Sequence, residues 1–140
     1  MPLNVRRALF PLSALLLLAA CHGPGIPYPE VADPDARVVI RFLDRYQAHD
    51  LDGMMACLDD GAVFRDATTG TLDKAQIERY LRDALEKHPD LRVTFGPPRR
   101  SEGTLQAKVR IQGQVISSST WIFVVKHRKI QSYSIGPAAP

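Results

Sequence analysis

Cysteines and long apolar runs are scarce in this sequence. Only Cys21 and Cys57 are cysteines among 140 residues, and the assignment of Cys21 given below leaves no partner for an internal disulfide. The apolar run of residues 8–20 is broken by Pro11 and falls short of the roughly 20 residues that a transmembrane helix needs. We therefore expect neither a disulfide-stabilised fold nor a membrane-spanning anchor.

Patterns that carry common catalytic or metal chemistry are also missing. The sequence has no G-x-S-x-G nucleophile elbow and no glycine-rich phosphate loop. The four histidines lack the pairwise spacing of metal ligands; they are His22, His49, His88 and His127. We therefore expect no metal site and no cofactor.

A nucleic-acid partner is not expected, although the whole chain has a formal net charge of +3. Two of the 18 basic residues, Arg6 and Arg7, precede Cys21, whereas all 15 acidic residues follow it. The chain after Cys21 is thus nearly neutral overall. A nearly neutral domain lacks the strong positive field that usually accompanies nucleic-acid binding.

The N-terminal segment has the three-part layout of an export signal: two arginines, an apolar run and small residues at its end. The last four of these residues, Leu18-Ala19-Ala20-Cys21, resemble the lipobox of bacterial lipoproteins. The resemblance implies that residues 1–20 are a cleaved signal peptide. It also implies that Cys21 carries a diacylglyceryl group on sulfur and a further acyl chain, commonly palmitate, on nitrogen.

This resemblance also bears on location and domain limits. His22 stands where lipoproteins kept in the inner membrane usually carry Asp, which favours the outer membrane and a domain facing the periplasm. Residues 21–32 are a lipidated cysteine and a Pro- and Gly-rich tether, which in extended form reaches about 30 Å. Residues 33–136 then form one domain, and residues 137–140 are a tail.

Three helices are predicted in the first half of the domain. One spans residues 33–48, with Asp-Pro at its start and an apolar stripe at helical spacing. A shorter one spans residues 50–58, with Gly61 placed to end it. The third begins with a capping-box pattern at residue 73 and stops at Pro89.

Strands are predicted from alternating apolar and polar residues. A short one covers residues 62–66, and the others cover residues 91–95, 105–112, 115–125 and 130–135. Helices followed by consecutive hairpin strands indicate an α+β domain, in which the helices pack on one face of a curved antiparallel sheet.

Three segments resemble the opening of the nuclear transport factor 2-like superfamily, which includes ketosteroid isomerase and SnoaL-like polyketide cyclases. They are residues 38–42, residues 48–53 with their Asp-Leu-Asp-Gly turn, and residues 62–66. The resemblance implies a cone-shaped domain, in which a bent sheet wraps around a long helix and leaves an apolar pocket at its open end.

The same resemblance implies a site and shows where this chain departs from it. Asp66 falls on the position of the isomerase general base. Phe42 stands where the isomerase has a Tyr donor, and no acidic residue follows Glu102 to supply the late-strand Asp. An isomerase or cyclase with Asp66 as its base thus stays only an alternative.

A rebuilt site for a small apolar ligand is a second reading of these residues. Aromatic and hydroxyl side chains fall on the predicted inner faces of the first helix and the strands. They are Phe42, Tyr46, Phe64, Ser117, Ser119 and Trp121. The plainer alternatives are a core position for Tyr46, a solvated strand for the serines and a turn-capping role for Asp66.

The sequence therefore leaves three functions open. The first is binding of a small apolar ligand or a protein partner without catalysis, the second is the isomerase-type enzyme, and the third is a structural module of an envelope complex. A homodimer is compatible with each. Cys57, among apolar neighbours, is expected to be a small buried side chain. Lys108 and Arg110 are expected on the solvent side of a sheet half that contains no acid.

Overall fold

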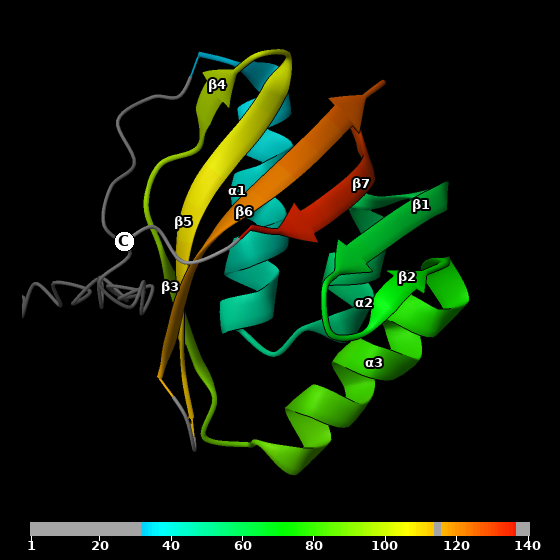
Figure 1. The fold of residues 1–140 in the computed structure, drawn as a ribbon, viewed down its shortest axis with the longest axis vertical. Helices are drawn as coiled ribbons and strands as arrows, with labels where there is room; N and C mark the ends of the chain where they lie inside the picture. The colour runs from blue at the N-terminus through cyan, green and yellow to red at the C-terminus, as the bar shows by residue number, and fades with distance from the viewer. Residues whose placement is uncertain (1–31, 114–115, 137–140) are drawn as a thin grey trace, which may run out of the picture.

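The computed structural model of the protein describes residues 32–113 and 116–136 (Figure 1). The predicted signal peptide, Cys21, the tether up to residue 31 and the tail at 137–140 lie outside the described residues. Within the two described ranges, no helix is both long enough and apolar enough to cross a membrane. These residues form an α+β domain with helices packed against a curved, unclosed sheet, which confirms the expected fold class.

The first and third helices begin where their capping residues predict. In α1 (Pro34–Gln47), the Asp33 side chain accepts a hydrogen bond from the backbone N–H of Asp35 at 3.0 Å. In α3 (Lys74–Lys87), Asp73 and Gln76 form a reciprocal capping box. Each carboxylate or amide oxygen satisfies a backbone donor that the helix itself leaves unpaired.

The prediction for the second helix is wrong at its C-terminal end. Helix α2 is Leu51–Ala56, and strand β1 (Leu58–Asp66) begins almost at once. Leu58 pairs with Ile130 of the last strand, and Gly61 lies inside β1 instead of ending a helix. Pairing with a strand that is distant in sequence has overridden the local helical spacing, which alone was visible in the sequence.

The remaining elements are strands of one sheet. They are β2 (Gly70–Leu72), β3 (Arg92–Phe95), β4 (Arg99–Ser101), β5 (Thr104–Gln112), β6 (Ser117–Lys126) and β7 (Lys129–Ile135). Their order is β2-β1-β7-β6-β5-β3, and β4 also pairs with β5. The short strands β2 and β4 were not predicted. Every pairing is antiparallel except that of β1 with β7, which is parallel.

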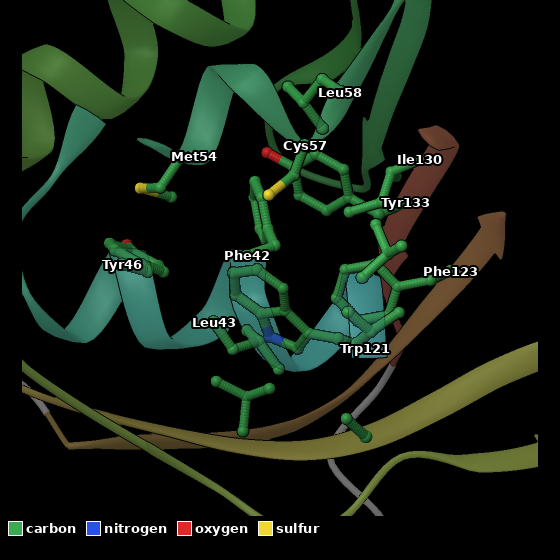
Figure 2. Close-up of a cluster of buried hydrophobic side chains, with 14 of the residues drawn as sticks. Phe42, Leu43, Tyr46, Met54, Cys57, Leu58, Trp121, Phe123, Ile130 and Tyr133 are labelled. Atoms are coloured by element: carbon green, nitrogen blue, oxygen red, sulfur yellow. The ribbon is translucent and has the colours of Figure 1, made fainter. Parts of the chain in front are cut away.

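The helices cover only one face of this sheet, which we call the inner face. Helix α1 packs against β3, β6 and β7, while α3 lies at the end formed by β1 and β2 (Figure 1). The core between them includes Phe42 and Leu43 of α1 and Phe123 of β6, each 0% exposed. Figure 2 shows these side chains meeting between the helix and the sheet.

Candidate functional site

Tyr133 of β7 lies at the centre of a group of aromatic side chains on the inner face. Its ring centroid is 4.6 Å from that of Phe64 and 5.7 Å from that of Trp121, and both pairs are stacked. It lies 5.4 Å from Phe42 and 5.9 Å from Phe123. Rings from α1, β1, β6 and β7 thus converge on one tyrosine, and we call these five residues the aromatic cluster.

The hydroxyl of Tyr133 is the exceptional atom of this cluster. The residue is 2% exposed, and among the described residues its hydroxyl oxygen is buried without a hydrogen-bond partner. A buried hydroxyl that finds no partner costs about 1–3 kcal/mol of stability. Such groups are rare in native proteins, and each one needs a structural or functional explanation.

Two more tyrosines contact the aromatic cluster. Tyr46 of α1 is 4% exposed and packs on Trp121 with ring centroids 6.1 Å apart. Tyr80 of α3 is 39% exposed and packs on Phe64 with ring centroids 5.8 Å apart. Helices α1 and α3 thus bring two phenols toward the one on β7, and Tyr80 is the member that reaches solvent.

All three phenols remain protonated near neutral pH. Burial raises the pKa of Tyr46 to about 12, and the neighbouring Tyr80 contributes to the rise. Burial raises the pKa of Tyr133 above its usual range, and both other tyrosines raise it further. Burial and then the charge of Asp66 raise the pKa of Tyr80. Each hydroxyl therefore keeps a proton that it can donate.

Asp66 lies at the end of β1, as predicted, and its carboxylate caps the following turn. It accepts hydrogen bonds from the backbone N–H and from the hydroxyl of Thr69, each at 3.3 Å. This is the turn-capping arrangement weighed in the sequence analysis. The carboxylate is partly exposed and lies near Tyr80, whose pKa it raises.

The two candidate serines differ in position. Ser119 of β6 accepts a hydrogen bond from Nε1 of Trp121 at 3.0 Å, and Trp121 is 3% exposed. Ser117, at the start of the same strand, is exposed and pairs with Ile111 of β5. The structure thus ties Ser119 to the aromatic cluster through Trp121 and leaves Ser117 at the far end of the strand.

The other candidate ligand residues are core residues. Phe42 and Phe64 are 0% and 1% exposed and pack against other aromatic rings. Tyr46 is also buried and packs on Trp121. The structure therefore brings together Phe42, Tyr46, Phe64, Ser119 and Trp121, while Asp66 lies near Tyr80 and Ser117 lies apart.

Sequence reasoning missed the central residue of this group. Strict alternation along β7 places Ile130, Ser132 and Ser134 on one face and Tyr133 on the other. In the structure, a register irregularity lets Val124 pair with Ser132 and Val125 with Ile130, so that Gln131 is an extra residue. Ile130 and Tyr133 therefore both point inward and are both buried.

Cys57 fulfils the expectation of a small buried side chain. It is 4% exposed, its Sγ donates to the backbone carbonyl of Gly53 at 3.4 Å, and burial raises the pKa of its thiol. A buried, protonated thiol is a poor nucleophile. Within the described ranges, no group of three or more His, Cys, Asp or Glu side chains is arranged to hold a metal ion.

Two adjacent hollows lie over the opposite, outer face of the sheet. One has a volume of about 390 Å³ and its lining includes Lys108, Arg110 and Ser118. The other has a volume of about 510 Å³ and its lining includes Arg99, Gln106 and Lys108. Their lining contains no acidic side chain. None of the five residues of the aromatic cluster lines either hollow, although Ser119, the hydrogen-bond partner of Trp121, lines the first.

Comparison with known families and structures agrees with the fold. Residues 39–132 match the model of the SnoaL-like domain. A SnoaL-like protein of unknown function from Burkholderia thailandensis is 20% identical, with a TM-score of 0.65 over 79% of this chain and 100% of that one.

Two further similar structures carry functional names. A putative polyketide cyclase from Sinorhizobium meliloti is 15% identical, with a TM-score of 0.64 over 71% of this chain and 94% of that one. A putative ketosteroid isomerase from Kribbella flavida is 11% identical, with a TM-score of 0.62 over 76% of this chain and 81% of that one. No curated protein matches the chain. Since the family model spans most of the described domain, the chain belongs to the SnoaL-like domain family.

Proposed function

We propose that this protein is a membrane-anchored lipoprotein whose SnoaL-like domain binds a small, mostly apolar molecule without converting it. The observation that carries the proposal is the buried, unpartnered hydroxyl of Tyr133. A ligand that offers it a hydrogen-bond acceptor removes the cost of leaving that hydroxyl unpaired. The surrounding rings supply apolar contact for the rest of the ligand.

The chemistry of the tyrosines defines the ligand class. All three phenols are protonated donors, and none of the aromatic side chains that surround Tyr133 carries a charge. The ligand is therefore a neutral, compact molecule with at least one carbonyl or ether oxygen. We expect it to enter beside Tyr80, the exposed member, which packs on Phe64.

Binding without catalysis is favoured by what surrounds Asp66. A general base needs a carboxylate that is free to accept a proton from a bound substrate. Oδ2 of Asp66 accepts two hydrogen bonds from Thr69, and this turn-capping role accounts for the carboxylate without a substrate. Phe42, which occupies the donor position of the isomerase pattern, has no hydroxyl to stabilise an enolate oxygen.

The anchor completes the proposal. Lipidation of Cys21 holds the domain at the periplasmic side of the outer membrane, because several acyl chains together make dissociation negligible. The test is metabolic labelling with radioactive palmitate, followed by fractionation of membranes. Label and membrane association are expected in the wild type and are expected to be lost in Cys21→Ser. A labelled Cys21→Ser variant would contradict the assignment.

The ligand test uses the full lipidated chain, purified in detergent. Organic extracts are analysed by mass spectrometry, and thermal stability is measured with a panel of neutral ketones, quinones and sterols. We expect a molecule that binds the wild type, binds Tyr133→Phe at least tenfold more weakly, and binds the Ser117→Ala control as well as the wild type. Recovery of that molecule unchanged after incubation supports binding alone.

Two outcomes would replace this proposal. Chemical change of the bound molecule that is lost in Asp66→Asn would establish the enzyme alternative. Absence of any bound molecule, together with equal ligand response of wild type and Tyr133→Phe, would favour a structural module. The close packing of rings around Tyr133 is the specific observation in favour of that module.

A further inference from the structure

The outer face of the sheet carries a continuous set of basic and hydroxyl side chains. The pairing of β3, β5 and β6 places Thr94, Arg110 and Ser118 in one row. The next row along contains Lys108 and Thr120, and the register of β4 adds Arg99 opposite Gln106. We call Arg99, Lys108, Arg110, Ser118 and Thr120 the basic face. The two hollows of about 390 and 510 Å³ lie over it.

The three cations of the basic face are not neutralised by the domain itself. Arg99, Lys108 and Arg110 are exposed and form no ion pair with any described residue. Of the other described cations, Arg45, Lys74, Arg82, Lys87 and Arg100 each pair with a carboxylate, whereas Arg65, Arg79 and Arg92 form no ion pair with a described residue either. Three unpaired cations beside hydroxyl donors form a surface that is complementary to phosphate groups.

The tether joins the domain at the edge of this face. Arg100 of β4 donates hydrogen bonds to Asp33, the N-cap of α1, at 2.7 and 3.1 Å. The first described residues therefore lie beside the strand that carries Arg99. If Cys21 is lipidated as proposed, the intervening residues reach about 30 Å when extended. That length is comparable to a nine-residue strand and allows the basic face to lie on the bilayer.

We propose that the basic face binds the headgroups of anionic phospholipids and so holds the anchored domain against the bilayer. Lys and Arg side chains near an anionic membrane each contribute attraction, and the hydroxyls donate to phosphate oxygens. Anchoring keeps the face at high effective concentration, so that a weak contact suffices. This inference extends the proposed anchor but concerns residues that take no part in the ligand site.

Self-association through the same face is disfavoured by its charge. A two-fold contact places the same patch of each copy against the other. Lys108 and Arg110 of one copy would then face a basic patch whose hollows have no acidic side chain in their lining. Like charges brought together in this way oppose association.

The experiment uses the chain from residue 21 to 140 with Cys21→Ser, which contains every described residue and has no acyl anchor. Flotation is measured with phosphatidylcholine vesicles and with vesicles that contain about 30% phosphatidylglycerol, a charge density at which surface attraction operates. The test variant is Lys108→Gln with Arg110→Gln. The control is Arg79→Gln with Lys87→Gln, which removes two exposed charges from α3.

We expect binding to the anionic vesicles alone, weakened about 25-fold in the test variant, since each basic side chain contributes about fivefold. The control should bind like the wild type. About 0.5 M salt should release the wild type and the control from the vesicles. Equal weakening in the two double variants would overturn the proposal. Binding of the wild type to neutral vesicles, or no binding to either kind of vesicle, would also overturn it. A wild-type dimer in sedimentation that Lys108→Gln with Arg110→Gln disrupts would also overturn it, in favour of self-association.

The vesicle test can succeed or fail independently of the proposed anchor and ligand. The vesicle test uses an unlipidated chain, so it does not depend on whether Cys21 is modified. It also leaves Tyr133 intact, so it does not depend on the interior ligand. A positive vesicle result with no palmitate label would keep the basic face and reject the anchor.

Discussion

The inner and outer faces of the sheet are built from the same strands but differ in burial, charge and type of side chain. On β5, Ala107 and Val109 are 1% exposed, whereas Lys108 and Arg110 between and beside them are exposed. The inner face is aromatic and buried, and among the described residues it carries one unpartnered hydroxyl. The outer face is charged, exposed and hollowed.

This contrast implies that the two proposed interactions depend on different physical forces. Packing and hydrogen bonding determine the behaviour of the inner face, because its side chains are removed from water. Charge and ionic strength determine that of the outer face, because exposed charges interact weakly and are screened by salt. Substitutions on one face should therefore leave the properties of the other unchanged.

The largest expected effect is a loss of stability on the inner face. Phe123→Ala removes a fully buried ring that contacts Phe42, Trp121 and Tyr133, and we expect the free energy of unfolding to fall by about 3–5 kcal/mol. Ser118→Ala, on the outer side of the same strand, should change it by less than about 0.5 kcal/mol. Urea denaturation measures both, and equal losses would contradict the division between the faces.

The next effect concerns the unpartnered hydroxyl and has the opposite sign. Tyr133→Phe keeps the ring and removes a buried oxygen without a partner. We expect the free energy of unfolding of the ligand-free domain to rise by about 1 kcal/mol. Urea denaturation of the domain after ligand extraction is the measurement. A loss of more than 1 kcal/mol would mean that the hydroxyl has a structural partner, and the ligand proposal would lose its main support.

The sequence was sufficient to predict the parts of the fold that depend on local signals. The capping residues Asp33 and Asp73 marked the starts of α1 and α3, and alternation located β3, β5 and β6 within one or two residues. These features need only neighbouring residues to form. The start of β1 was not predicted, because it depends on pairing with Ile130, far along the chain.

The candidate site was less predictable than the fold, because part of it also depends on strand pairing between distant residues. Tyr46 and Trp121 were identified because helical spacing and strand alternation place them inward. Tyr133 was not identified, because the extra residue Gln131 shifts the register of β7 and lets Tyr133 face inward together with Ile130. Irregularities of this kind depend on both partner strands, and no spacing rule applied to β7 alone reveals them.

An effect of similar size separates the two serines of β6. Ser119→Ala removes the acceptor for the buried Nε1–H of Trp121, so we expect the free energy of unfolding to fall by about 1–2 kcal/mol. Ser117→Ala changes an exposed side chain and should have an effect below about 0.5 kcal/mol. Thermal and urea denaturation compare the pair. Equal effects would show that the Trp121 hydrogen bond contributes little and that the inner face tolerates an unpaired donor.

The smallest effect lies at the edge where the two faces meet. Hydrogen bonds from Arg100 lower the pKa of Asp33 below its ordinary value, so the folded state holds that proton less tightly than the unfolded state. The resulting stabilisation is present above the unfolded pKa of about 3.9 and is lost as pH falls through the lowered folded value.

Arg100→Gln should therefore be slightly less stable than the wild type at about pH 7, and the difference should shrink at about pH 3, below the ordinary carboxyl pKa. Urea denaturation at the two pH values is the measurement. Arg99→Gln, on the same strand but without an ion pair among the described residues, is the matched control and should show no such pH dependence. A deficit in Arg100→Gln that stays constant with pH would mean that Arg100 stabilises β4 by packing along α1, because packing does not depend on the charge of Asp33.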